Sequence, residues 1–200
     1  MTFMELAKKR FSCRKFSDRP VEPEKLQAVL EACNAAPTAK NDQAHRIYVL
    51  QSPEVLAKVD QLTHCRYGAP VALLFAYDRE EDWKNPLEEG VHSGIEDAAI
   101  VATHAMLQAA ELGLDTCWVN YFPNSKLERE LGLPERESSV LLLPVGYDAR
   151  DGNALPRKGI NVNPGLRRRR TGYGIYDKHK KNTDKTDRAS CGHCSPPVCY

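Results

Sequence analysis

Two arginines and a serine near the N-terminus have the spacing of an anion-binding site. Arg10 and Arg14 stand four residues apart with Ser12 between them, in the run RFSCRKF. Guanidinium groups and a hydroxyl at this spacing can converge on one phosphate or on one anionic edge of a ligand. Taken alone, the run is more typical of solvated charge that follows a helix.

A second polar segment precedes an expected strand. The run AAPTAKNDQ contains Pro37, Thr38, Asn41 and Gln43. Carboxamides at alternate positions can face a planar heterocycle that presents hydrogen-bond donors and acceptors. Asn and Asp are also suited to ordinary turns, which is the competing interpretation of this run.

The C-terminal end carries a third group of candidate residues, namely Cys191, His193, Cys194 and Cys199. Thiolates and imidazole suit zinc, and the Cys-x-x-Cys pair could instead be a redox dithiol. No thioredoxin-like βαβ pattern surrounds the pair, so an inert tail is the third interpretation. Composition turns charged and polar from about residue 178, so we expect residues 178–200 to form a disordered tail.

Composition indicates an ordinary globular protein. The chain has 200 residues, 42% of them apolar, and a formal net charge of +1. This length fits one domain, and the near-zero charge argues against nucleic acid as a partner, although the run 167–170 consists of four arginines. We find neither a stretch of about 18 apolar residues nor the apolar region of a signal peptide. The expectation is a cytoplasmic protein with no membrane partner.

Hydrophobic periodicity and capping residues predict alternating helices and strands. The expected helices cover 2–10, 23–36, 53–59, 95–112 and 125–132, with Ser93/Glu96 and Ser125/Glu128 as capping boxes of the last two. The expected strands cover 46–50, 71–77, 116–122 and 139–145, with 71–77 central because it is apolar on both faces. We therefore expect an α/β (α+β) layer architecture. The helix 95–112 is apolar nearly all round, so we expect a partner subunit to cover it.

Four motifs in this order resemble the FMN-dependent nitroreductase family. The run RFSCRKF looks like its phosphate motif, and AAPTAKNDQ is similar to its Pro-Ser-x-x-Asn-x-Gln loop, with Thr38 in place of Ser. The run GIEDAAIVATHAMLQAAELGLDTCWV resembles its long helix and following strand, and LLLPVGYD resembles its late strand. The resemblance covers residues 3–150. It implies a dimeric three-layer sandwich in which helices flank a central mixed sheet, with residues 1–177 as the FMN-binding domain.

The resemblance also implies residue roles. Arg10 and Ser12 would hold the FMN phosphate, and Arg14 would lie near the N1–O2 edge of the flavin. The other subunit would contribute Pro37, Thr38, Asn41 and Gln43. Backbone groups around Val119 and Asn120 would face N5, and Arg168 and Arg170 would complete the phosphate site. No catalytic side chain is expected, because FMN carries the chemistry.

The expected activity is that of an FMN-dependent NAD(P)H oxidoreductase. It would form a homodimer and reduce nitroaromatic, quinone or related small-molecule acceptors by ping-pong hydride transfer. Two alternatives stay open from the sequence. One is a flavin-dependent reductive dehalogenase or dehydrogenase of the same fold. The other is a flavin- or metal-binding regulatory module that acts through the cysteine tail.

Overall fold

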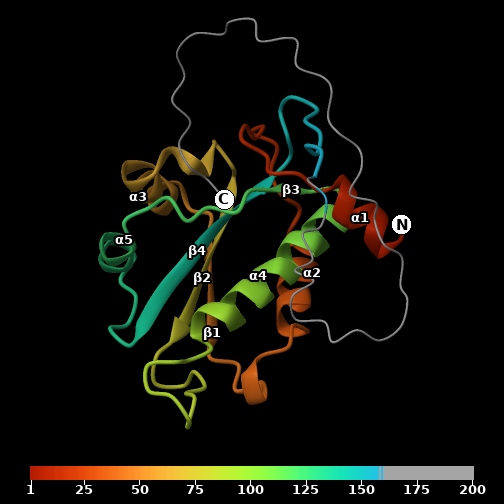
Figure 1. Ribbon diagram of the computed structural model, residues 1–200. Helices are drawn as coiled ribbons and strands as arrows, with labels where there is room; N and C mark the ends of the chain where they lie inside the picture. Colours follow the sequence, from red (N-terminus) through yellow and green to blue (C-terminus); the bar gives the residue numbers. More distant parts are fainter. Residues whose placement is uncertain (158, 160–200) are drawn as a thin grey trace, which may run out of the picture. The chain divides into compact units, whose positions relative to one another are not determined.

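A four-stranded sheet organises the chain. In this computed structural model, which describes residues 1–157 and residue 159, the strands are β1 (His45–Leu50), β2 (Val71–Asp78), β3 (Asp115–Thr116) and β4 (Glu137–Gly146). Their order in the sheet is β1-β2-β4-β3 (Figure 1). Residues 1–155 belong to one compact unit.

All three strand pairings are antiparallel, which corrects the expectation of a mixed sheet. The connection 51–70 returns the chain to the end of the sheet that it left, because Leu50 at the end of β1 pairs with Ala72 near the start of β2. The segment 79–114 instead carries the chain from the Asp78 end of β2 to the opposite end of the sheet, where β3 pairs with the end of β4. Within the described chain, a parallel pairing occurs as an isolated bridge between Ser12 and Thr116.

Strand β2 is central, as its apolar sequence predicts, and all eight of its residues are buried. Alternate side chains point to opposite faces of a strand, so β2 contributes to two separate cores. Leu73 and Phe75 pack in the core that contains residues of α2 (Pro23–Asn34) and α4 (Gly94–Glu111). Leu74 packs in the core on the other face.

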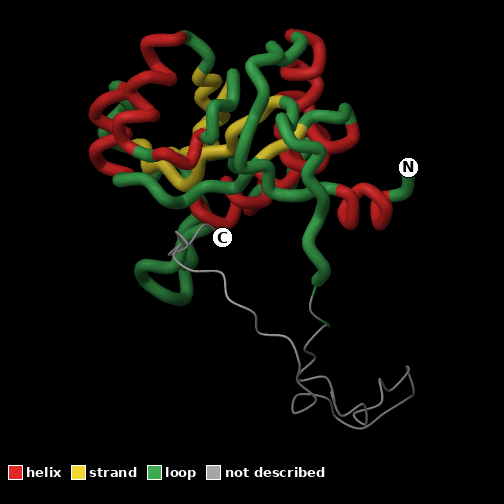
Figure 2. The backbone as a smooth tube through the Cα atoms, turned by 90° about the horizontal axis from the view of Figure 1, so that it is seen from above, coloured by secondary structure: helices red, strands yellow, loops and turns green. Residues whose placement is uncertain are grey.

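Helices cover both faces of the sheet, which confirms the three-layer prediction. Helices α2 and α4 lie on one face, and α3 (Pro53–Leu62) and α5 (Asn124–Leu131) lie on the other (Figures 1 and 2). The short α1 (Phe3–Lys9) has the predicted capping box between Thr2 and Glu5. No helix in the described part of the chain is both long and apolar enough to cross a bilayer.

Two predicted capping boxes are wrong. Ser93 has helical backbone angles, and its hydroxyl donates to Asp97 at 2.7 Å instead of pairing with Glu96. Helix α5 begins at Asn124, one residue before the predicted cap. Glu128 is drawn away from the helix terminus, because its carboxylate accepts the backbone N–H of Ser139 at 2.8 Å.

The predicted strand 116–122 is mostly irregular. It forms a ladder only over β3, followed by an isolated bridge between Val119 and Leu142. Proline has no N–H to donate, so Pro144 of β4 interrupts the ladder between these two points, where it accepts the N–H of Cys117.

Part of the sequence prediction lies outside the described residues. This holds for the domain boundary at 177, for Arg168 and Arg170, and for the tail residues Cys191, His193, Cys194 and Cys199.

Candidate functional site

The segment that follows α1 forms an additional edge of the sheet. Ser12 pairs with Thr116, and the backbone N–H of Cys13 donates to the carbonyl of Thr116 at 2.9 Å. Cys13 is fully buried, whereas Ser12 is half-buried and Arg14, which lies in a bend, is exposed. The Ser12 hydroxyl is therefore partly accessible at this edge, and the Arg14 guanidinium lies at the surface.

These groups are available to a ligand. In the described part of the chain, neither the Ser12 hydroxyl nor the Arg14 guanidinium forms a hydrogen bond or ion pair with protein. Arg10 is half-buried, and its Nη1 lies 3.6 Å from the sulfur of Met106 on α4. In the described chain Arg14 has no carboxylate partner, so its guanidinium and the Ser12 hydroxyl are a suitable donor set for a phosphate or another anion.

Carboxylates on the inner side of this segment hold the backbone. A cavity of about 350 Å³ is lined by Arg10 together with Asp115 and Asp148. Asp115 accepts the N–H of Asp148 at 2.9 Å, and Asp148 accepts the Cys13 thiol at 3.2 Å. Burial raises the pKa of Asp115. The described ranges contain no group of three or more His, Cys, Asp and Glu residues that could hold a metal ion. The bond from the Cys13 thiol to Asp148 links the segment to the chain that follows β4.

Of the two predicted residues after β3, one keeps an unused backbone donor in the described chain. The N–H and carbonyl of Val119 are both used in bonds of 2.9 Å with Leu142. Asn120 is held by its side chain, which donates to the Val140 carbonyl at 3.0 Å and accepts the Trp118 indole N–H at 2.7 Å. In the described chain the Asn120 N–H has no such partner. Of the two predicted residues, only Asn120 therefore offers a backbone donor.

The loop from Pro37 to Gln43 is a tight, strained turn around η1 (Ala39–Asn41). Lys40, Asn41 and Gln43 have φ values of 49°, 61° and 53°, which L-residues rarely adopt. The side chains of Asn41 and Gln43 are exposed and bonded to each other at 3.1 Å, whereas the Thr38 hydroxyl accepts the Gln43 N–H at 3.2 Å. Non-glycine residues in this region cluster at functional sites.

A single chain does not bring this loop to the other candidate residues. Thr116, the partner of Ser12, lies beside Val145, which pairs with Val71 at one end of β2. The loop enters β1 at His45, which pairs with Tyr77 at the other end of β2. Six residues of strand separate the two ends, a distance of about 20 Å. Figure 1 shows this separation. The two predicted groups must therefore belong to different sites within one chain.

Two residues near the loop were missed as candidates. Asp97 on α4 is buried, and its carboxylate accepts the N–H of Ala39 at 3.0 Å. The Nδ1 of His45 is buried without a hydrogen bond from the described residues. Burial, assisted by the charge of Arg46, lowers the His45 pKa and favours the neutral ring. The sequence contains a signal for Asp97, because it follows Ser93 by four residues. The capping-box pattern instead favours Glu96 as the partner of Ser93.

Comparison with known proteins defines the family. The nitroreductase family model matches residues 7–67 and 66–147. A crystal structure of a nitroreductase family protein from Clostridium difficile 630 has a TM-score of 0.73 and 41% identity, covering 75% of this chain and 86% of that one. For an FMN-dependent nitroreductase from Clostridium difficile R20291, the TM-score is 0.65 and the identity 30%, covering 77% and 92%. FMN reductase (NAD(P)H) from Bacillus subtilis is 29% identical, covering 75% of this chain and 68% of that protein. The chain belongs to the nitroreductase family.

Proposed function

We propose that this enzyme, an FMN-dependent NAD(P)H oxidoreductase, reduces nitroaromatic, quinone or related acceptors in a ping-pong sequence. The names of an FMN-dependent nitroreductase and an FMN reductase (NAD(P)H) among its relatives support the cofactor and the electron donor. Bound FMN supplies the redox chemistry, which is acceptance and release of a hydride equivalent. The observation that carries the proposal is the set of donors at Ser12, Arg14 and Asn120 that have no partner among the described residues.

These residues fit FMN by their chemistry. Arg10 and Ser12 would hold the phosphate, and the charge of Arg14 near the N1–O2 edge would stabilise the anionic reduced flavin. The free N–H of Asn120 would donate to N5. Arg168 and Arg170, which lie outside the described residues, stay predicted phosphate ligands, and a cytoplasmic location also stays a prediction.

A homodimer would complete the site. The Pro37–Gln43 loop lies about 20 Å along the sheet from Ser12 in its own chain, so a second copy would have to supply it. Large apolar side chains exposed on α1 and α4 support such an interface, namely Phe3, Met4, Ile95 and Ile100. A homodimer hides exposed apolar surface of this kind.

The activity is tested by the visible spectrum of the FMN-loaded protein under anaerobic conditions. NADPH or NADH should bleach the flavin absorbance, and a nitroaromatic or a quinone should then restore it. Persistence of the oxidised spectrum with both donors would contradict the proposed reaction. Failure of the protein to bind FMN would contradict the proposed cofactor site.

The shared site is tested by subunit complementation. Arg14→Ala and Gln43→Ala should each weaken FMN binding in the homodimer. In a mixed dimer both changes would fall in one site and leave the other site intact. Random exchange of equal amounts should therefore restore roughly a quarter of the wild-type sites.

A matched control uses the neighbouring cation. Lys15→Ala removes another exposed charge of the same segment, at a position that the predicted FMN contacts do not include. FMN affinity should stay near the wild-type value in this variant. No recovery of FMN-binding sites after mixing Arg14→Ala with Gln43→Ala would contradict a site made by two subunits.

A further inference from the structure

The strained turn at Ala39–Asn41 needs an external support. Lys40, Asn41 and Gln43 all lie in the left-handed region of backbone angles, and none of them is glycine. Such conformations persist only when surrounding structure over-determines them. Within the turn, the support consists of the bond from the Gln43 N–H to the Thr38 hydroxyl and the bond between the side chains of Gln43 and Asn41.

The outer support comes from a buried carboxylate. Asp97 lies in the first turn of α4 and is 4% exposed. Its Oδ1 accepts the N–H of Ala39 at 3.0 Å, and its Oδ2 accepts the Ser93 hydroxyl at 2.7 Å. No Lys or Arg in the described residues forms an ion pair with Asp97. Its carboxylate bonds to one backbone donor of the turn and to one hydroxyl of its own helix, and its charge also acts on the nearby His45 ring.

This arrangement fixes the turn to a rigid element. Helix α4 has 18 residues and packs against α2 and the sheet. This packing fixes the position of the helix and therefore of the Asp97 backbone. A hydrogen bond to an ionised acceptor is stronger than a neutral one. The bond to Ala39 therefore fixes where the turn presents the side chains of Asn41 and Gln43.

We propose that Asp97 is a positioning residue for FMN, which holds the Thr38–Gln43 turn in the geometry that contacts the flavin bound by the partner subunit. This inference rests on the proposed function above. Asp97 does not touch the ligand and acts through Ala39. The turn is preorganised, so FMN binding does not have to supply the free energy of straining three residues.

The test compares variants of Asp97 by their affinity for FMN. Asp97→Ala removes both hydrogen bonds and should weaken FMN binding by about tenfold or more. Asp97→Asn keeps an oxygen for the Ala39 N–H, and its amide can donate to the Ser93 hydroxyl. Binding should therefore recover to within about threefold of wild type. Affinity is read from quenching of FMN fluorescence, and the flavin circular dichroism reports the geometry of the bound ring.

Glu128 provides a matched control on the other face of the sheet. Its Oε1 accepts the N–H of Ser139 at 2.8 Å and the hydroxyl of the same residue at 2.7 Å, which is the same pair of donor types. Glu128→Ala should lower the melting temperature as Asp97→Ala does. It should leave FMN affinity and the flavin dichroism at their wild-type values.

A second variant tests the contact without changing α4. Ala39→Pro removes only the donor N–H, at the first position of a helical turn where proline is tolerated, and Thr38 before it is already extended. It should weaken FMN binding as Asp97→Ala does, and it decides the matter if Asp97→Ala does not fold. Wild-type affinity in a folded Asp97→Ala or in Ala39→Pro would overturn the proposal, as would failure of Asp97→Asn to recover. Failure of the wild-type protein to bind FMN would instead overturn the proposed function on which it rests.

Discussion

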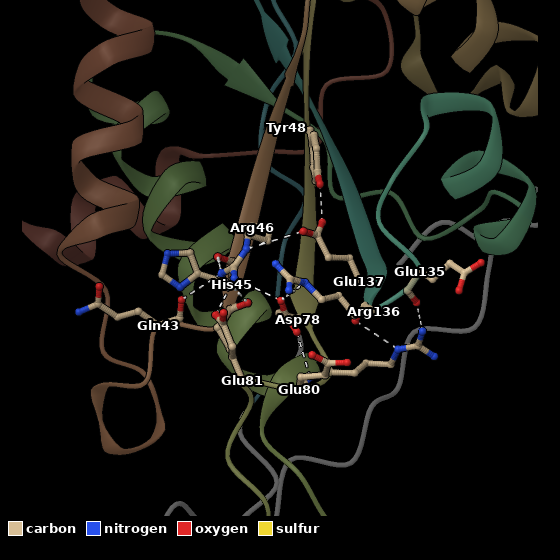
Figure 3. A network of polar contacts seen from close by, with 12 residues as sticks. Gln43, His45, Arg46, Tyr48, Asp78, Glu80, Glu81, Glu135, Arg136 and Glu137 are labelled. Carbon is tan, nitrogen blue, oxygen red and sulfur yellow. Dashed lines mark hydrogen bonds and ion pairs between the residues drawn. The ribbon is translucent and has the colours of Figure 1, made fainter.

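Arg46 on β1 is the centre of a partly buried ionic network that joins three strands (Figure 3). Its guanidinium lies 3.4 Å from Asp78 on β2, 3.8 Å from Glu137 on β4 and 2.5 Å from Glu81. The same group also donates to the backbone carbonyls of Ala44 and His45, at 3.3 Å and 3.1 Å. We expect Arg46→Ala to lower the stability of the whole sheet, because it removes the one cation that all three strands share in the described chain.

The size of this loss depends on the partners that Asp78 and Glu137 retain when Arg46 is removed. Asp78 is completely buried but keeps Arg136, whose Nε lies 2.8 Å away. Glu137 keeps the hydroxyl of Tyr48. Breaking a buried ion pair by removing one partner costs about 3–5 kcal/mol. Both carboxylates retain one partner, so we expect about 2–3 kcal/mol of lost unfolding free energy and a melting temperature lower by about 5–10 °C.

Urea unfolding at one fixed protein concentration measures this loss. The midpoint should fall while the dependence on urea concentration stays unchanged. The control is Arg136→Ala, because that side chain is 51% exposed and leaves Arg46 facing Asp78. It should cost about 1 kcal/mol. An equal or larger loss in Arg136→Ala would refute the reasoning that Arg46 holds the network.

Three further outcomes are expected. Gly94→Ala should destabilise the fold by about 3 kcal/mol or more in thermal unfolding, because the new Cβ would lie 2.1 Å from the Tyr77 ring; unchanged melting would contradict this packing. The Tyr147 hydroxyl holds the pKa of Glu22 at about 2 instead of 4.5. Stability contributed by ionised Glu22 is therefore present above pH 4.5 and is lost as the pH falls toward 2. Urea unfolding against pH should show wild type exceeding Glu22→Gln only at the higher pH, and a constant difference would contradict the assignment. Burial raises the pKa of the Cys13 thiol to about 12, so peptide mapping after alkylation near pH 8 should find it modified only in urea.

Local sequence patterns predicted most of the elements. Strand 71–77 was assigned to the centre of the sheet because a strand with apolar residues on both faces must be covered on both. The capping box at Thr2 and the start of α2 at Pro23 were also correct. These features depend on neighbouring residues, and the intrinsic preferences of the chain decide them.

The errors occurred where another residue competed for a group that the predicted cap or strand needed. The Ser93 hydroxyl donates to Asp97, and the Glu128 carboxylate accepts the N–H of Ser139, so neither predicted capping box forms. Pro144 on β4 interrupted the strand predicted at 116–122 from across the sheet. Two of these contacts join residues on different elements of the fold, whereas Asp97 competes with Glu96 from the same first turn of α4.

The sequence by itself determined the residue types of the candidate site and the order of its motifs, because these are properties of the chain alone. Which donors are free was decided by the tertiary structure. The bridge between Val119 and Leu142 uses the backbone of one predicted residue and leaves the N–H of Asn120 available. The length of β2 likewise separates the Pro37–Gln43 loop from Ser12. Hydrogen-bond partners and distances depend on which strands pair and in which register, and only the folded chain fixes that choice.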